Sequence, residues 1–370
     1  GGVDQNGAYA PYAFPLSGRN AKPIHMEPEL GRGTYNYFPY FHIKDQKGGL
    51  FIAMGWPIMW KADFTPDTTE MEDGTAIPCT RIDMGQARFD AVLQPGESAV
   101  MPSITLLHHT EADPDNATNH WRHFFMDCIM RRVEGGLFPP HLSGGTSWLY
   151  AEMKDATEAN QIDAMDQYLK HSIPIDYWWM DAGWYWKRRG EHLTTWMETG
   201  TWLVDTDRFP TEFAAISEHG AKHGVKTLLW FEPERVRRGS DLWNRHPEWL
   251  LHYLRDDNPW LADNALFDLG NPAACDWLID TIDGIIKDSH IKIYRQDFNF
   301  PPAPYWAHNT EPDREGILEN LHILGYYRYW DTLIVRNRDR YGAVARVTAV
   351  LTELQINVAN MSVCRSKRGA

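Results

Sequence analysis

The sequence predicts a multidomain protein in which a β-sandwich precedes an incomplete (β/α)8 barrel of the TIM type. Short alternating segments separated by Gly, Pro and Asp turns fill residues 1 to about 115, as in an all-β domain. From Gly145 onward, apolar strand-like runs alternate with amphipathic helical patterns, which predicts a parallel sheet with helical crossovers. Since no glycine-rich phosphate loop follows any of these runs, a barrel is favoured over a nucleotide-binding open sheet.

The β-rich part is expected to end near residue 115, and residues 116–144 are expected to form a connecting helical segment. The strands predicted in the β-rich part include Tyr35–Ile43, Leu50–Trp56, Arg88–Leu93 and Ser98–Leu107.

Residues 145–331 are expected to supply five βα units, so that strands one to five of the barrel are present. The predicted strands are Ser147–Ala151, Ile175–Asp181, Lys226–Phe231, Leu266–Asp268 and Ile291–Asp297, and the predicted helices are Thr157–His171, Glu212–His223, Pro272–Lys287 and Gly316–Trp330. Four acidic residues stand at strand ends: Asp181, Glu232, Asp268 and Asp297. In a barrel they converge on the face where active sites lie.

The ten residues from Tyr177 to Trp186 place four tryptophans and two tyrosines around Asp181. Aromatic faces and a carboxylate are the two groups that bind the C–H faces and hydroxyls of a sugar. A buried strand followed by an aromatic core patch explains the run equally well, and the sequence leaves both interpretations open.

The net charge of −14 argues against nucleic acid or an anionic membrane as a partner, and no run has the length of a transmembrane helix. A neutral oligosaccharide or glycoside fits better, and a homo-oligomer stays open. The four scattered cysteines are expected to be free thiols. Because the chain begins Gly1-Gly2, we expect a truncated or processed amino end.

Asp297 is the sharpest candidate for catalysis, because it ends an apolar run beside Arg295, whose charge favours an ionised and hence nucleophilic carboxylate. A purely structural Asp–Arg pair is the alternative. Glu232 is expected either to contact substrate or to form a structural bridge with Arg235. Two such carboxylates suit glycoside hydrolysis.

His219 and His223 have i,i+4 spacing, yet neither a Glu nor a third ligand lies nearby in the sequence. A solvated helix face is therefore expected, with no metal and no other cofactor.

A series of motifs resembles the glycoside hydrolase family 36 α-galactosidases, or melibiases, over roughly residues 20 to 330. The series comprises Met180-Asp181-Ala182-Gly183-Trp184, Trp202 in Thr-Gly-Thr-Trp-Leu-Val-Asp, Trp230-Phe231-Glu232-Pro233-Glu234, His246-Pro247-Glu248-Trp249, Phe267-Asp268-Leu269 and Tyr294-Arg295-Gln296-Asp297-Phe298-Asn299. The β-rich part then looks like the end of that family's amino-terminal supersandwich.

The resemblance implies a retaining mechanism with Asp297 as nucleophile. It implies that Asp181 binds sugar hydroxyls, that Trp202 forms a wall of the subsite, and that Arg295 and Asn299 contact the sugar. Trp184, Trp230 and Glu232 complete the expected substrate contacts.

Four departures from the family pattern bear on function. Ala182 stands where a second aspartate is expected to bind galactose, and Gln296 replaces the tryptophan of a Lys-Trp-Asp motif, while no arginine precedes Phe267-Asp268. After Asp331 the sequence resembles the first βαβ of an ACT domain over residues 332–370, so the barrel's acid/base aspartate is expected to be missing.

The predicted function is an α-galactosidase-like retaining glycosidase, impaired by the missing acid. The alternatives are a catalytically silent carbohydrate-binding barrel and an amino-acid-sensing ACT fusion. An accidental fusion of two incomplete reading frames is the favoured origin of the junction near residue 332.

Overall fold

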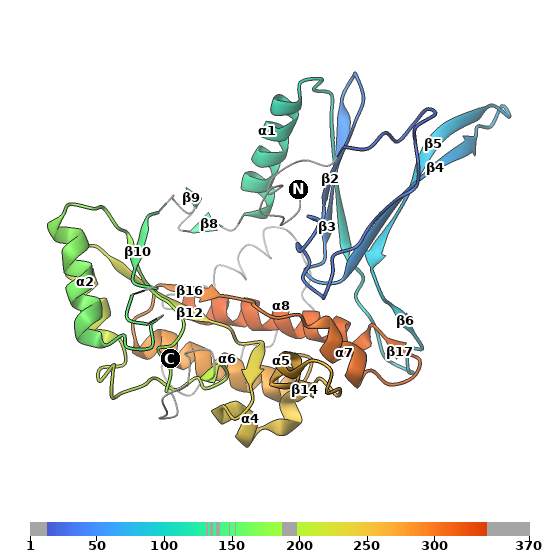
Figure 1. Ribbon diagram of the computed structural model, residues 1–370. Helices are drawn as coiled ribbons and strands as arrows, with labels where there is room; N and C mark the ends of the chain where they lie inside the picture. Colours follow the sequence, from blue (N-terminus) through green and yellow to red (C-terminus); the bar gives the residue numbers. More distant parts are fainter. Residues whose placement is uncertain are drawn as a thin grey trace, which may run out of the picture.

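The computed structural model describes residues 13–130, 132–133, 136–137, 141–147, 149–151, 153–186 and 198–338. In Figure 1 the antiparallel strands of the amino-terminal part gather at the upper right. The parallel strands and helix α2 lie on the opposite side, and the long helix α8 crosses the middle of the view. Within the described residues, none of the helices combines the length and the hydropathy needed to span a bilayer.

Two three-stranded antiparallel sheets form the amino-terminal part. One has the order β1-β4-β5, from β1 (Ile24–Met26), β4 (Trp60–Glu70) and β5 (Ala76–Gln86); the other has the order β2-β3-β7, from β2 (Tyr40–Lys44), β3 (Gly49–Gly55) and β7 (Ser103–His109). Alternate residues in the first half of β4 are buried, as the period of a strand requires. The ring of Phe41 lies 5.9 Å from that of Trp60 and 5.2 Å from that of Phe64, so the two sheets share one apolar cluster.

The predictions for this part were incomplete. The hairpin of β4 and β5 was missed, because the many Thr, Asp and Pro residues along it hide its alternation. The strand expected at Arg88–Leu93 is only the short β6 (Asp90–Ala91), which pairs with β17 (Arg314–Glu315) rather than with either amino-terminal sheet.

Helix α1 (Pro114–Phe124) follows the second sheet and continues as a π-helical turn, Phe125–Ile129. Asp113 caps α1 by accepting hydrogen bonds from the backbone N–H groups of Asp115 and Asn116. The Trp121 ring stacks 5.6 Å from Phe51, so α1 packs on the β2-β3-β7 sheet. The short strands β8 (Arg132–Val133) and β9 (Gly136–Leu137) then pair antiparallel.

The rest of the described chain is built around a four-stranded parallel sheet with the order β10-β11-β12-β16. Its strands are β10 (Ser143–Gly145), β11 (Tyr177–Met180), β12 (Lys226–Phe231) and β16 (Ile293–Gln296). Helices α2 (Glu158–Lys170) and α3 (Ala214–Lys222) follow β10 and β11, and Thr157 and Asn160 form a capping box at the start of α2. The first strand lies at Ser143–Gly145 and not at the predicted Ser147–Ala151. The observed strand consists of one serine and two glycines, so it lacks the apolar pattern from which strands are predicted.

The described residues provide four parallel strands instead of the five predicted. The run expected as the fourth, Leu266–Asp268, belongs to β15 (Asn264–Phe267), which pairs antiparallel with β13 (Arg235–Arg237) and β14 (Leu250–His252). This small sheet, with α4 (Asp241–Arg245), the 3-10 turn Pro247–Trp249 and α5 (Pro259–Ala262), is inserted between β12 and α6. A buried apolar run of four residues does not by itself reveal which sheet it joins.

Helices α6 (Pro272–Asp288) and α8 (Ile317–Arg338) pack against each other, and α7 (Ala303–Asn309) precedes β17. Residues 332–338, where a new strand was expected, are the last two turns of α8. Leu333 is buried in the apolar cluster beneath the parallel sheet. Arg336 pairs with Asp280 of α6 at 2.5 Å, and the Asn337 amide donates to Asp283. These contacts explain why the helix continues; residues 339–370 lie outside the described part.

A second apolar cluster joins the two halves of the chain. It combines Trp56, Trp60 and Phe64 of the amino-terminal part with Tyr305 of α7 and Ile323 of α8. The amino-terminal sheets are therefore packed onto α7 and α8.

Candidate active site

A pocket with a volume of about 470 Å³ opens at the carboxyl ends of the parallel strands. Its lining residues are Trp179, Asp181, Arg235, Trp260, Arg295, Asp297 and Asn299. Asp181 directly follows β11 and Asp297 directly follows β16, so strand ends position both carboxylates. A neighbouring cavity of about 370 Å³ shares Trp179, and no titratable side chain is among its described lining residues.

Asp297 is held by donors on both of its carboxylate oxygens. Its Oδ2 accepts a hydrogen bond from Trp230 Nε1 at 3.0 Å and lies 3.3 Å from Arg295 Nη1, while Oδ1 accepts from the Phe298 N–H at 3.0 Å. Burial alone raises the pKa of Asp297, but the hydrogen bonds from Trp230 and Asn299 and the charge of Arg295 outweigh it, so the pKa lies below its ordinary value. The charge of Arg295 acts in the expected direction, but the hydrogen bonds from Trp230 and Asn299 lower the pKa of Asp297 more.

Arg295 is itself fixed by Trp179, because its guanidinium lies 4.9 Å from the centre of that indole ring. Trp179 is half-buried, whereas Trp178 next to it is fully buried and donates to Gln161. The alternation of β11 thus sends one tryptophan into the core and the other to the pocket.

Glu232 lies behind the pocket and not in its lining. It is completely buried; its Oε1 accepts from the Asn299 N–H at 2.7 Å, and its Oε2 pairs with Arg235. Burial raises the pKa of Glu232, although Arg235 and the Asn299 N–H act in the opposite direction. Of the two roles left open by the sequence, the bridge to Arg235 is the one observed, and it supports two residues that do line the pocket.

Three tryptophans expected to contact the sugar are core residues. Trp184, Trp202 and Trp230 are at most 3% exposed, and none is among the described lining residues. The Trp184 ring packs 6.1 Å from Trp202 and 5.4 Å from Phe231, and its Nε1 donates to the Trp230 carbonyl. The aromatic core patch therefore accounts for most of the run after β11, and Trp230 reaches the site only through its hydrogen bond to Asp297.

Asp268 does not join the other strand-end acids. It follows the antiparallel strand β15, accepts a hydrogen bond from the Gly270 N–H at 3.0 Å, and has a pKa raised by burial. Asp181 and Asp297 therefore line the pocket as the predicted convergence requires. Glu232 follows β12 at the same face and bonds to two lining residues, so only Asp268 of the four acids lies elsewhere.

Ala182 also differs from expectation. It is 3% exposed and belongs to the apolar cluster beneath the sheet, so it is not an empty position in the pocket wall.

Three lining residues were missed: Trp179, Trp260 and Arg235. Trp179 could have been predicted, because side chains along β11 point alternately to the two faces of the sheet and only one of its two adjacent tryptophans can lie in the core. Trp260 comes from the short helix α5 and is 44% exposed, and Arg235 begins β13. Both come from the insertion after β12, whose position over the strand ends has no local signal.

The metal-ligating groups among the described lining residues of the pocket are the carboxylates of Asp181 and Asp297. Imidazoles and a carboxylate that lie close together are found elsewhere, between α2 and α3.

Comparison with known proteins assigns the family. Residues 151–341, more than half of the chain, match the family model described as melibiase. The chain belongs to the melibiase family. A second family model, that of the ACT domain, matches residues 332–370 and overlaps the melibiase match at residues 332–341.

Several melibiase relatives align with most of this chain. It is 23% identical to α-galactosidase AgaA from Geobacillus stearothermophilus over 76% of this chain and 37% of AgaA. It is 22% identical to α-galactosidase Mel36A from Lactobacillus acidophilus over 84% of this chain and 41% of Mel36A. This melibiase chain thus spans only about two fifths of the relatives' length.

Solved structures show the same fold. The crystal structure of the GH36 α-galactosidase AgaA of Geobacillus stearothermophilus in complex with stachyose matches 85% of this chain and 42% of its own, with a TM-score of 0.65 and 19% identity. The galactosidase domain of the α-galactosidase-sucrose kinase AgaSK matches 86% of this chain and 42% of its own, with a TM-score of 0.65 and 19% identity.

Proposed function

We propose that this chain is a retaining α-glycosidase of the α-galactosidase type, which cleaves terminal α-linked sugars from oligosaccharides by double displacement with Asp297 as nucleophile. The state of Asp297 carries the proposal. It is a carboxylate at a strand end, in a pocket, with a lowered pKa and donors on both oxygens. An ionised carboxylate that is held in place can attack an anomeric carbon without first losing a proton.

The other lining residues have complementary roles. Asp181 accepts hydrogen bonds from sugar hydroxyls, while Arg295 and Asn299 orient the sugar next to Asp297. Trp179 and Trp260 offer apolar faces to the C–H groups of the ring. AgaA was solved with stachyose and with raffinose, so these oligosaccharides are the first natural substrates to test.

The proposal places the four parallel strands in a (β/α)8 barrel, with active-site residues at their carboxyl ends. It also treats the two amino-terminal sheets as the end of a β-supersandwich. The shared cluster of Phe41, Trp60 and Phe64 supports the sandwich, and the parallel pairing of β10, β11, β12 and β16 supports the barrel.

The first chemical step forms a bond between a carboxylate oxygen of Asp297 and the anomeric carbon, while the bond to the leaving oxygen breaks. That oxygen needs a proton unless it is stable as an anion. Within the described lining, Asp181 and Asp297 are the carboxylates, and neither is free to act as the acid if one binds hydroxyls and the other attacks. The chain is therefore expected to cleave substrates with good leaving groups, and to lose about 10²–10⁴-fold in rate on the others.

The test compares a nitrophenyl α-galactoside with raffinose for the full chain and for Asp297→Asn. We expect slow hydrolysis of the nitrophenyl substrate, little hydrolysis of raffinose, and neither reaction in Asp297→Asn. Asp268→Asn is the matched control, because it changes a partly buried strand-end carboxyl outside the pocket and is expected to keep the activity. Saturable raffinose binding without hydrolysis of either substrate would replace the proposal with a silent carbohydrate-binding protein.

A further inference from the structure

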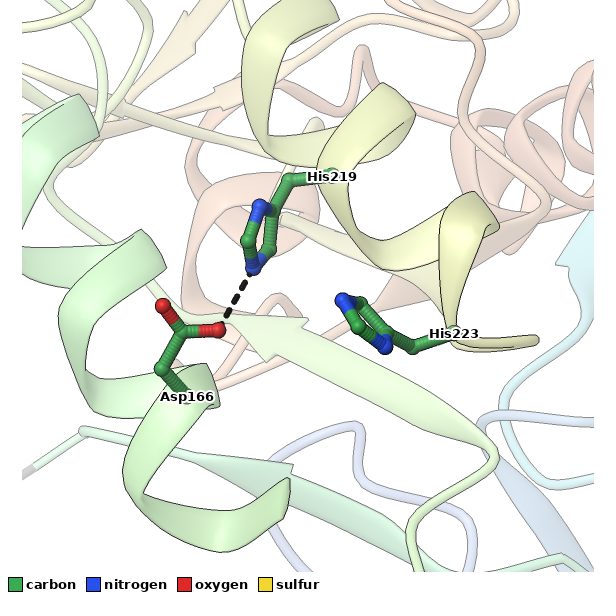
Figure 2. A group of neighbouring side chains, drawn as sticks. All are labelled: Asp166, His219 and His223. Atoms are coloured by element: carbon green, nitrogen blue, oxygen red, sulfur yellow. Dashed lines mark hydrogen bonds and ion pairs between the residues drawn. The ribbon is translucent and has the colours of Figure 1, made fainter. Parts of the chain in front are cut away.

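Two helices that cover the parallel sheet bring three potential metal ligands together. Figure 2 shows Asp166 on one helix and His219 and His223 on the other, with the three side chains directed toward one another. Asp166 belongs to α2, His219 lies in the last turn of α3, and His223 is its C-cap. The two histidines share a helix face because they are four residues apart. The sequence around His219 offers no third ligand; the third ligand is Asp166, which lies 53 residues upstream.

The geometry is close to that of a bound ion. Asp166 Oδ1 and His219 Nε2 are 2.7 Å apart, the two imidazole rings are 5.3 Å apart, and one ligand atom from each of the three residues lies within 4.8 Å of the others. Around a tetrahedral Zn²⁺ with bonds of about 2.0–2.2 Å, neighbouring ligand atoms are about 3.3 Å apart. Small side-chain rotations therefore suffice to replace the Asp166–His219 hydrogen bond with two metal bonds.

We propose that Asp166, His219 and His223 bind a divalent transition metal ion, with Zn²⁺ as the best match, and that the ion joins α2 to α3. Two imidazoles and one carboxylate suit Zn²⁺, Co²⁺, Ni²⁺ or Cu²⁺, whereas Mg²⁺ and Ca²⁺ require oxygen ligands. The side chains of His219 and Asp166 are 22% and 49% exposed, so a metal can enter from solvent and water can complete its coordination.

The ion has a structural role. Zinc hydrolases of the H-E-x-x-H type place a catalytic Glu directly after the first histidine. Gly220 stands there in this chain, and a Cβ at Gly220 would lie 2.8 Å from the Val225 carbonyl oxygen, so a Glu cannot occupy this position without displacing the backbone. The cluster also shares no residue with the pocket around Asp297. Metal binding should therefore stabilise the packing of α2 on α3 and leave glycoside hydrolysis unchanged.

The first test titrates Zn²⁺ by calorimetry into the full chain, after chelation and dialysis. We expect one site in the parent chain, and binding at least tenfold weaker in His219→Gln and in His223→Gln. His42→Gln is the matched control, because His42 forms another close histidine pair, with its Nε2 2.8 Å from His109 Nε2. Equal Zn²⁺ affinity in the parent chain and both α3 variants, or no binding at all, would overturn the proposal.

A second measurement does not depend on how well the variants fold. The parent chain loaded with Co²⁺ should show visible d–d bands of nitrogen and oxygen ligation, without the strong thiolate charge-transfer band that ligation by Cys79 or Cys128 would give. A thiolate band would place the ion at a cysteine and contradict the proposed site. Circular dichroism of the variants verifies that weakened binding does not reflect unfolding.

Discussion

Replacing Glu319 with Gln should change how the stability of the chain depends on pH. Glu319 of α8 is 4% exposed and is the carboxylate that joins α8 to the amino-terminal sheets. It accepts hydrogen bonds from Trp56 Nε1 at 2.9 Å, the Met59 N–H at 3.0 Å and Gln86 Nε2 at 3.1 Å. Burial nevertheless dominates and raises the pKa of Glu319 from its usual 4.5 to about 7.

The sign of the effect follows from proton binding. Because the folded state binds the proton more tightly, the stabilisation is complete below the unfolded-state pKa and is lost as pH rises through about 7. The two pKa values correspond to about 2.5 kcal/mol that Glu319 contributes at pH 5 and no longer contributes at pH 8. For a single unfolding transition of a chain of this size, that amounts to about 3 °C in Tm.

Glu319→Gln has no titrating proton, so this part of the pH dependence should disappear. The variant also carries a pH-independent loss of stability, because its amide N–H₂ meets the donating Gln86 Nε2. The assay is thermal unfolding of both proteins between pH 5 and 8, with Glu72→Gln on the exposed β4–β5 turn as the control. We expect the Tm difference between parent and Glu319→Gln to shrink by about 3 °C from pH 5 to pH 8; a difference that is constant over this range would refute the reasoning.

Three further predictions concern the site and the end of α8. Trp230→Phe removes a donor to Asp297, which raises the pKa of that carboxyl, so the acidic limb of the kcat/KM profile on an aryl α-galactoside should move to higher pH; an unmoved limb would contradict the role of Trp230. Ala182→Asp places a carboxylate in the apolar cluster, so we expect a lower Tm with no gain in preference for galactosides over other α-glycosides, and an increased preference would show that position 182 reads the sugar after all. Leu333→Ala should destabilise the chain by about 2–5 kcal/mol in urea unfolding, because the Leu333 side chain is 4% exposed and packs in the same cluster. An effect below about 1 kcal/mol would mean that the end of α8 does not pack as described.

Sequence patterns were most informative where a local period determines the structure. The strand Lys226–Phe231 was predicted to the residue, and Asp181 and Asp297 were both placed at strand ends that meet at the pocket. The sequence pointed to Arg295 as the partner of Asp297, and the two lie 3.3 Å apart, but it gave no sign of the hydrogen bonds from Trp230 and Asn299.

The errors arose where three-dimensional context decides. Trp184 and Trp202 look like sugar platforms in the sequence, but both are buried in the core. Only the alternation of β11 identifies Trp179, which is half-buried, as the tryptophan that lines the pocket. Trp260 reaches the pocket through an insertion that has no recognisable period.

The same limitation applies to long-range contacts. The third metal-ligand candidate, Asp166, comes from a different helix from His219 and His223, so no local spacing reveals it. The end of α8 was expected to open an ACT-like βαβ unit because of the family resemblance, yet residues 332–338 are helical and Leu333 packs in the same apolar cluster as residues of α6.

Trapping of the glycosyl-enzyme tests the central claim most directly. The chain is incubated with α-galactosyl fluoride, whose leaving group needs little acid assistance, and the labelled protein is digested and mapped by mass spectrometry. Because hydrolysis of the intermediate also requires a base, we expect a covalent adduct to accumulate on the peptide containing Asp297, with the label on that residue. A label on Asp181 or another carboxylate, or turnover of the fluoride by Asp297→Asn at the parent rate, would contradict the assignment of Asp297 as the nucleophile.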